Sequence, residues 1–397
     1  MNSRRRFVES TFGPSDGRHY PLTSSMGSVQ ETTPVEFGEV LDFTSAKCSW
    51  ACRRLLIEKI GGESYHLGLD RSNPRPADVA VVRVEKVGHH RHIETENDRR
   101  LRLYPGDRLT CVFGNRYATD VYEGRVLGLK KLHLLTGSGM IGTIVSRHRD
   151  VSRPTTVSFV GYVADRSGRR VNLKELCFPP VCGRPPQPDV IFVVGTGMNT
   201  GKTTVTRKIL RALVSRGVRV AGCKLTGSVS PRDLDELRAT GALHATDFSD
   251  YGFPSTYQAS VTELVRLFDS MLGACCQRGA QLVVVELADG FLQKETEMLL
   301  RSEEIRGRVR GVVLAAACSG SALCAADAIQ RAGLELWVVS GLISNSPLFA
   351  REFTSHSSVP LASSRTNANR LTRLVMARIV AMRPEERHST ALAGSSI

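Results

Sequence analysis

An apolar run that breaks into a glycine turn and then into a helical pattern constrains this chain most. It spans residues 188–204 and reads PDVIFVVGTGMNTGKTT. This order predicts a strand, a phosphate-binding loop and a helix. Glycines let consecutive backbone N–H groups point inward, and the new helix adds its positive N-terminal end. We expect Lys202 to reach the terminal phosphates of a nucleotide and Thr203 to hold Mg²⁺.

The loop is one residue longer than the usual pattern, G-x-x-x-x-G-K-[ST]. Thr196 stands where the first glycine belongs, and Gly195 lies six positions before Gly201. The residues predicted to bind the nucleotide are Gly195, Thr196, Gly197, Met198, Asn199, Thr200, Gly201, Lys202, Thr203 and Thr204.

Apolar runs and helical patterns alternate after the loop. Continuous apolar runs near residues 218–224, 281–286, 311–317 and 335–340 predict strands that are buried on both faces. Such strands, separated by helices, are typical of a parallel sheet that is covered on both sides. The predicted fold class is therefore α/β, with a doubly wound P-loop domain over residues 189–382.

Polar residues that end these runs are candidate site residues, because such sheets bind ligands at the carboxyl ends of their strands. They are Lys224, Glu286, Asp289, Ser319 and Asn345. We expect Glu286 to hold Mg²⁺ together with Thr203, and the alternative is an ordinary surface ion pair. Lys224 either neutralises charge on a transferred phosphoryl group or a substrate carboxylate, or lies in solvent.

A long irregular segment, residues 247–257, separates the second strand from the strand that ends at Glu286. Long loops in compact domains often bind ligands. Asp247 and Asp250 are therefore candidate catalytic residues that complete the metal or substrate site. Ser255 is expected to cap the helix that follows.

The chain before residue 179 has a different pattern. Residues 1–40 are predicted to be a disordered tail, and short alternating runs over residues 41–178 predict a smaller, mainly β domain that forms a barrel or a sandwich. A helix is expected at residues 43–60. A proline-rich linker follows at residues 179–188, and residues 383–397 form a second disordered tail.

Two short segments of the β-rich region have alternative interpretations. The run His89-His90-Arg91-His92 is favoured as a solvated loop, and the alternative is a site for a metal ion or an anionic substrate. Gly137-Ser138-Gly139 indicates a flexible turn, since no helical pattern follows it.

Composition excludes several classes of protein. The net charge of +14 is spread over both halves of the chain, so nucleic acid is not an expected partner. Apolar runs stay well short of the roughly 20 residues that cross a bilayer, and no signal-type segment follows the first residues. We expect a cytoplasmic protein with reduced cysteines. Zinc binding by the pairs Cys48/Cys52 and Cys177/Cys182 is a minor alternative.

Four motifs resemble those of the dethiobiotin synthetase family. Residues 195–203 resemble its phosphate loop, G-T-D-T-x-V-G-K-T, which has the same six-residue glycine spacing. Residues 224–227 resemble its lysine motif, K-P-x-x-(S/T)-G, and residues 286–290 resemble its E-G-A-G-G. Residues 341–345 are similar to the late strand whose asparagine, here Asn345, meets the adenine base.

This resemblance implies an enzyme that requires ATP and Mg²⁺, phosphorylates a carboxylate or carbamate, then closes a bond, often as a homodimer. Gly197 replaces the loop aspartate of that family, the lysine motif lacks its proline, and the β-rich region has no counterpart there. Dethiobiotin is therefore not the expected product.

The resulting hypothesis is a ligase or kinase that activates a small carboxylic acid or amino acid by phosphoryl transfer. Lys202 and Lys224 would stabilise the phosphates, and the β-rich domain would select the substrate or form dimer contacts. The alternative is a nucleotide switch, such as a maturation GTPase or metallochaperone, although the sequence contains no Asn-Lys-x-Asp guanine motif. A nucleic-acid-associated ATPase is a third possibility that rests on charge alone.

Overall fold

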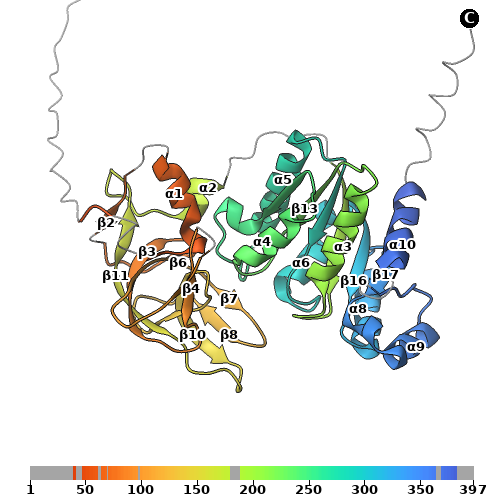
Figure 1. Cartoon of the computed structure of the whole chain (residues 1–397), viewed down its shortest axis with the longest axis horizontal. Helices are drawn as coiled ribbons and strands as arrows, with labels where there is room; N and C mark the ends of the chain where they lie inside the picture. The colour runs from red at the N-terminus through yellow and green to blue at the C-terminus, as the bar shows by residue number, and fades with distance from the viewer. Residues whose placement is uncertain are drawn as a thin grey trace, which may run out of the picture. The chain divides into compact units, whose positions relative to one another are not determined.

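The computed structural model describes residues 39–41, 47–60, 64–68, 70–96, 99–178, 188–363 and 368–381 (Figure 1). The predicted tail at 383–397 and nearly all of the tail at 1–40 and the linker at 179–188 lie outside the described residues. The predicted domain boundaries therefore stay predictions.

A β-rich region precedes the phosphate loop, as predicted. Its nine-stranded sheet consists of β1 (Lys47–Cys48), β2 (His66–Gly68), β3 (Val79–Lys86), β6 (Arg108–Phe113), β7 (Arg116–Tyr117), β8 (Tyr122–Arg125), β9 (Leu132–Leu134), β10 (Met140–Arg147) and β11 (Thr156–Ala164). Strand β6 pairs with β3, β3 with β11, β11 with β9, β9 with β10, and β10 again with β6. This ring of pairings closes the sheet as a barrel. A separate hairpin joins β4 (His92–Glu94) to β5 (Arg100–Arg102).

Strand β3 shows why the barrel needs helices outside it. Its alternate residues Ala80, Val82 and Val84 belong to one buried apolar cluster, whereas Val79 and Val81 belong to another. Both faces of the strand are thus covered, as expected when successive side chains point to opposite sides. The second cluster also contains residues of the 3-10 helix η1 (Trp50–Cys52), of α1 (Arg53–Ile60) and of α2 (Leu173–Cys177).

The predicted helix over residues 43–60 is wrong at residues 47–48, and residues 43–46 lie outside the described part of the chain. Lys47 and Cys48 instead pair with Leu109 and Thr110 of β6, and regular α-helix begins only at Arg53. Strand pairing at an open edge of β6 therefore overrides the helical pattern there.

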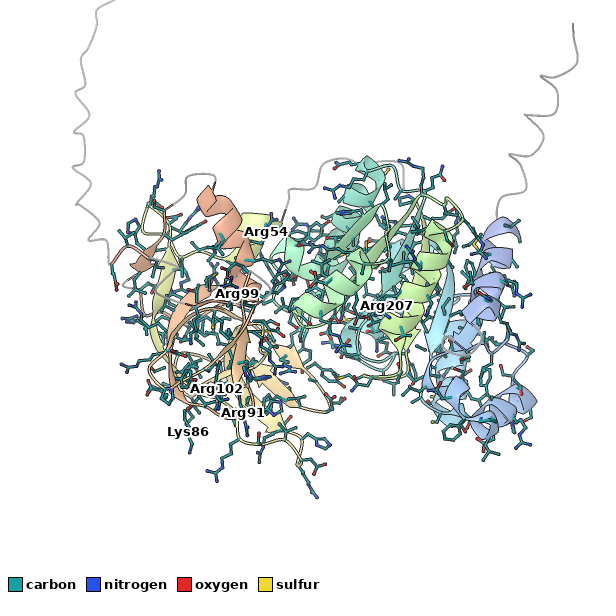
Figure 2. All side chains as sticks on the ribbon, viewed as in Figure 1. Arg54, Lys86, Arg91, Arg99, Arg102 and Arg207 are labelled. Carbon is teal, nitrogen blue, oxygen red and sulfur yellow. The ribbon has the colours of Figure 1, made fainter. Side chains whose placement is uncertain are left out.

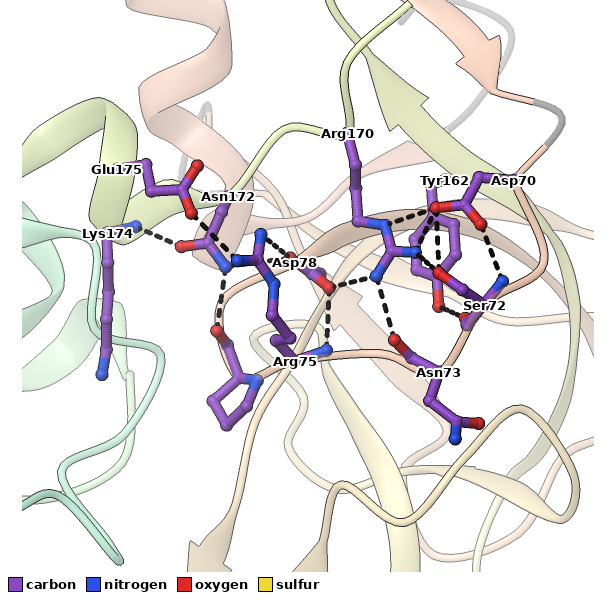
Figure 3. A network of polar contacts seen from close by, with 11 residues as sticks. Asp70, Ser72, Asn73, Arg75, Asp78, Tyr162, Arg170, Asn172, Lys174 and Glu175 are labelled. Carbon is purple, nitrogen blue, oxygen red and sulfur yellow. Dashed lines mark hydrogen bonds and ion pairs between the residues drawn. The ribbon is translucent and has the colours of Figure 1, made fainter.

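A network of polar contacts fixes the start of β3 (Figure 3). The Asp78 side chain is fully buried and accepts hydrogen bonds from Arg170 Nη1 at 2.7 Å, Asn172 Nδ2 at 2.9 Å and the backbone N–H of Arg75 at 2.8 Å. A buried carboxylate is tolerated when it is paired and hydrogen-bonded in this way. The network ties β3 to the connection between β11 and α2.

The P-loop region contains a six-stranded parallel sheet, in the order β14-β13-β15-β12-β16-β17. The strands are β12 (Asp189–Gly195), β13 (Val220–Lys224), β14 (His244–Asp247), β15 (Leu282–Glu286), β16 (Val309–Ala315) and β17 (Leu336–Ser340). The four predicted apolar runs all fall on these strands, so the predicted fold class is confirmed.

Helices cover both faces of this sheet (Figure 1). Ile191 and Val193 of β12 pack in one apolar cluster with residues of α3 (Lys202–Val214), α4 (Pro231–Arg238) and α10 (Ala368–Ala381). Val190, Phe192 and Val194 pack in the other cluster. The helices with residues in that cluster are α5 (Val261–Gln277), α6 (Lys294–Arg301), α7 (Glu303–Arg306), α8 (Ser319–Arg331) and α9 (Pro347–His356). Two 3-10 helices complete the region: η2 (Phe248–Tyr251) and η3 (Leu342–Asn345).

Within the described residues, none of the helices combines the length and apolar character that crossing a membrane requires.

The packing of Trp337 on Gly311 gives a test of this core. A Cβ added at Gly311 would lie 2.0 Å from Cε2 of the Trp337 ring, which is 1% exposed. We expect Gly311→Ala to lower the free energy of unfolding by about 1–3 kcal/mol, because overpacking forces the core to shift. Urea denaturation of the two proteins measures this difference. In the control Gly320→Ala, the added Cβ has nothing within 4 Å, so stability should stay equal or rise slightly.

Candidate active site

The phosphate loop joins the end of β12 to the start of α3. Asn199 and Gly201 have positive φ angles of 56° and 98°, a conformation that glycine adopts at no steric cost and asparagine more readily than most residues. A Cβ at Gly195 would lie 2.7 Å from Cδ of Lys202. Gly195 is therefore required because the stem of Lys202 occupies that space.

Lys202 is held at the loop by backbone carbonyls. Its Nζ donates to the carbonyl oxygen of Gly197 at 2.7 Å and to that of Asp289 at 2.6 Å. The residue is 7% exposed, and burial lowers the pKa of its ammonium group, although Glu286 and Asp289 oppose that shift. The ammonium group is thus fixed over the loop, and its contact with nucleotide phosphates stays a prediction.

Thr203 and Glu286, the two predicted metal ligands, are in contact. Thr203 Oγ1 donates to Glu286 Oε1 at 3.0 Å. Glu286 ends β15 and is 2% exposed, so the alternative of a surface ion pair is wrong. Because Val193 of β12 pairs with Glu286, the sheet register places this carboxylate beside the loop. A hydroxyl and a carboxylate oxygen are suitable ligands for Mg²⁺, so this pair could hold the ion.

Lys224 is buried rather than solvated, so the alternative of a strand-end lysine in solvent is also wrong. It ends β13, is 8% exposed, and pairs in the sheet with Glu286. Its Nζ forms an ion pair with Asp233 of α4. Burial alone would lower the pKa of Lys224, but Asp233 and Glu286 raise it above its ordinary value, so the side chain remains a cation.

Asp247 and Asp250 lie one strand further along the sheet, at the end of β14. Asp250 accepts hydrogen bonds from Arg53 Nη2 at 2.7 Å and from Thr246 Oγ1 at 2.9 Å. Asp247 caps η2 through the N–H of Ser249, and burial together with Asp250 raises its pKa to about 6. Both carboxylates thus hold Arg53 of α1, and their catalytic role stays a prediction.

Ser255 and Asn345 are two further predicted positions, and neither begins a helix. The helix after the long segment is capped by Ser260 rather than Ser255, because α5 begins only at Val261 and Ser260 forms a capping box with Glu263. Asn345 is exposed in η3, whose first backbone N–H, that of Leu342, donates to the Thr200 carbonyl at 3.1 Å. Its contact with an adenine base stays a prediction.

A cavity of about 620 Å³ adjoins the phosphate loop, and both regions of the chain line it. The loop region contributes Met198, Lys224, Gly227, Ser228, Val229, Ser230, Asp233, Ala288 and Asp289. The β-rich region contributes His89, His90, Arg91, His92, Glu94, Arg100, Arg116, Tyr117, Ala118, Thr136, Gly137 and Ser138. Residues 89–92, favoured as a solvated loop, line this cavity: Arg91 is exposed, whereas the three histidines are partly buried. A site for a metal ion or an anionic substrate there stays a prediction.

Sequence reasoning missed Arg116 and Tyr117, which follow an ordinary glycine turn and carry no motif. The sequence signals that could have located this side of the cavity were the histidine run at residues 89–92 and the glycine turn at residues 137–138. His90 is neutral at physiological pH, because burial and the positive charge of Arg116 lower its pKa to about 3.

The phosphate loop also contacts the β-rich region directly. Asn199 Nδ2 donates to Asp120 Oδ2 at 2.9 Å, and Asp120 lies in the turn between β7 and β8. The same two strands thus carry Arg116 at the cavity and touch the tip of the loop.

A larger cavity of about 720 Å³ lies between the β4–β5 hairpin and helices α3 and α4, and contains none of the phosphate-loop residues. Basic residues line much of it: Arg99, Arg100, Arg207, Lys208, Arg211 and Arg232. Figure 2 shows further basic side chains, among them Arg54, Lys86, Arg91 and Arg102. They come from several elements, so the positive charge is spread over the surface.

Cysteines give no metal site in the described part of the chain. Cys48, Cys52 and Cys111 are buried, and burial raises the pKa of the Cys52 thiol to about 12. No group of three or more His, Cys, Asp or Glu residues among the described residues is arranged to hold a metal ion. Cys182 lies outside them.

The strand–loop–helix unit and the parallel sheet define a P-loop NTPase domain. No protein-family model matches the chain. Over 174 residues it is 26% identical to the ATP-dependent dethiobiotin synthetase BioD of Vibrio cholerae serotype O1, a match that covers 38% of this chain and 75% of that protein. This similarity supports the P-loop NTPase assignment.

Two solved structures show a weaker likeness. The signal recognition particle receptor FtsY from Elizabethkingia anophelis is 19% identical, with a TM-score of 0.32 and coverage of 52% of this chain and 74% of that one. The signal recognition particle 54 kDa protein from Aeropyrum pernix K1, in complex with GDP, is 18% identical with a TM-score of 0.31, covering 53% and 54%. These TM-scores are below 0.5, and the two likenesses carry no argument about function.

Asp289 gives a test of the electrostatics of this site. Burial raises its pKa to about 6, against the opposing effect of Lys202 and Lys224. An unfolded aspartate titrates near about 4, so the folded state binds more protons between about pH 4 and pH 6, and stability falls as pH rises through that window.

We expect Asp289→Asn to remove this loss, because asparagine carries no charge and tolerates the positive φ of 62° at this position. Relative to the wild type, the variant should gain about 1–3 kcal/mol of stability between about pH 4 and pH 7. Urea denaturation across this pH range measures the difference. The control Asp150→Asn, in a side chain that is 91% exposed, should change stability by less than about 0.5 kcal/mol. Parallel stability curves for Asp289→Asn and the wild type would contradict the electrostatic argument.

Proposed function

We propose that this protein is an ATP- and Mg²⁺-dependent enzyme that activates a small carboxylic acid or amino acid by phosphoryl transfer. The observation that most supports this proposal is the cavity of about 620 Å³ beside the phosphate loop. Met198 of the loop lines it, as do Lys224 and Asp289 at and after neighbouring strand ends. A concave site of this size, with a few charged groups directed into it, is typical of a small-molecule substrate.

The nucleotide side of the site is supported by three contacts already described. Lys202 would stabilise charge on the terminal phosphates. Thr203 and Glu286 would hold Mg²⁺, which neutralises phosphate charge when it is bound. ATP is favoured over GTP by the similarity to an ATP-dependent synthetase and by the absence of an Asn-Lys-x-Asp motif from the sequence.

The chemistry needs no general base, because a carboxylate is already ionised at neutral pH. One of its oxygens would form a bond to the γ-phosphorus of ATP as the bond to the β–γ bridging oxygen breaks. The products are ADP and an acyl phosphate, which a second nucleophile then consumes. Lys224 reaches the same cavity as a permanent cation, so it would stabilise the negative charge that passes between the two groups.

A homodimer, which the resemblance implies, and a cytoplasmic location, which the sequence pattern predicts, remain part of this proposal. A nucleotide switch is the competing outcome, since a P-loop NTPase of this kind could also hydrolyse nucleotide to change its binding to a protein. Screening purified protein for ADP release with small acids separates the two. Acid-dependent release supports the enzyme, whereas release that ignores every acid and rises with a protein partner supports the switch.

Lys202→Ala tests the assignment of the phosphate loop. Removing the ammonium group should lower kcat for ADP formation by about 10²–10³-fold or more, because one preorganised charge at a transferred phosphoryl group is worth that much. A coupled assay of ADP formation measures the effect.

Lys208→Ala is the matched control, since Lys208 lies on the same helix with its side chain exposed. Its turnover should equal that of the wild type. Normal ADP formation by Lys202→Ala would show that the reaction takes place elsewhere.

A further inference from the structure

Arg116 is a partly buried cation at the cavity, and the carboxylates of Asp120 and Asp289 act on its charge from beyond ion-pair distance. Lys224 is paired with Asp233, and Lys202 is held by two carbonyls at the phosphate loop. Among the described residues, no carboxylate lies within ion-pair distance of Arg116, although its side chain is partly buried. A positive charge withdrawn from water in this way is costly unless an anion neutralises it.

One edge of the guanidinium group is engaged, and the other has no hydrogen-bond partner among the described residues. Nη1 donates to the backbone carbonyl of Leu135, which His90 Nε2 also approaches at 2.9 Å. Nε is buried without a hydrogen-bond partner, and no contact of Nη2 to a described residue is found beside it. The Nε–Nη2 edge of arginine presents two parallel donors, which match the two oxygens of a carboxylate.

The surroundings fix this orientation. The guanidinium carbon lies 5.9 Å from the centroid of the Tyr122 ring, and the neutral imidazole of His90 brings no competing charge. Burial lowers the pKa of Arg116 to about 10, so the group remains protonated at physiological pH. The strand β7 that carries Arg116 is also tied to the phosphate loop through the neighbouring Asp120–Asn199 contact.

Resting on the proposed function, we infer that the acceptor carries a second carboxylate, which the Nε–Nη2 edge of Arg116 binds while the first one receives the phosphoryl group. The two carboxylates have separate cations: Lys202 at the start of α3 and Lys224 at the end of β13 for one, and Arg116 on β7 for the other. A carboxylate clamped by both donors of an arginine has its oxygens engaged, and is poorly suited to attack phosphorus. Arg116 is therefore a specificity-determining residue, and the substrate class is a small dicarboxylate.

The test compares each dicarboxylate with its own monoamide, which has the same shape but lacks one charge. Succinate, glutarate, adipate and L-glutamate, with their monoamides, are titrated calorimetrically into the full chain in the presence of Mg²⁺ and a non-hydrolysable ATP analogue. We expect at least one diacid to bind about 10- to 100-fold more tightly than its monoamide, as expected for hydrogen bonds between charged groups.

Arg116→Gln should reduce the ratio of diacid affinity to monoamide affinity to nearly one. It should weaken binding of the diacid and leave binding of the monoamide almost unchanged. Arg116→Lys keeps the charge without the paired donors, so its preference should be intermediate, and it serves if the glutamine variant does not fold. The control Arg83→Gln, on the outward side of β3 where Arg83 pairs with Glu85, should retain the full preference. If Arg116 had only a structural role, its substitution would weaken binding of the diacid and of the monoamide equally.

The inference is overturned if no diacid is preferred over its monoamide by the wild type, or if the preference persists in both Arg116 variants. Formation of ADP with the same acids is measured in parallel. Turnover without a diacid preference would defeat this inference and leave the proposed function intact. A preference that depends on Arg116, with no acid-dependent ADP formation, would defeat the proposed function instead.

Discussion

The balance of buried charge at the carboxyl edge of the six-stranded sheet governs this structure. Parallel strands end on the same side, so the register brings Glu286 beside Val193 and Lys224 beside Glu286. Neither charge can be solvated there, and each is satisfied by a neighbour: Thr203 donates to Glu286, and Asp233 pairs with Lys224. Buried charges persist when they are paired and hydrogen-bonded. The arrangement that stabilises the edge is also the one that phosphate and metal ions require.

Close backbone packing around the phosphate loop explains several glycines at once. A Cβ at Gly290 would lie 3.0 Å from Cα of Gly197, and one at Gly341 would lie 2.5 Å from the carbonyl oxygen of Thr200. The loops that follow β15 and β17 can therefore approach the phosphate loop only because these positions lack side chains. The longer loop with Gly195 at its start is thus enclosed on two sides, which restricts its conformation before any nucleotide binds.

The fold of the P-loop region was predictable because it depends on local patterns. Continuous apolar runs located the strands, and the strand-end rule selected Glu286 and Lys224 as candidate site residues, both of which are buried. Contacts between distant segments were not predictable in the same way. Lys47 and Cys48 form a strand because β6 offers an edge. Arg116 lies on β7, which pairs with β8, and lines the cavity beside the phosphate loop. No local pattern records such pairings, so the motif-free half of the site was missed.

Three side-chain contacts join the β-rich region to the P-loop region, so it is more than an independent addition to the chain. Arg53 binds Asp250 at the end of β14, Asp120 binds Asn199 in the phosphate loop, and the Tyr257 hydroxyl donates to Glu123 at 3.0 Å. The long segment after β14 therefore anchors this region, and a catalytic role of its acids stays a prediction. The β-rich region lines one side of the cavity. Because three contacts fix its position, it can hold its side chains in a fixed geometry, which selective binding requires.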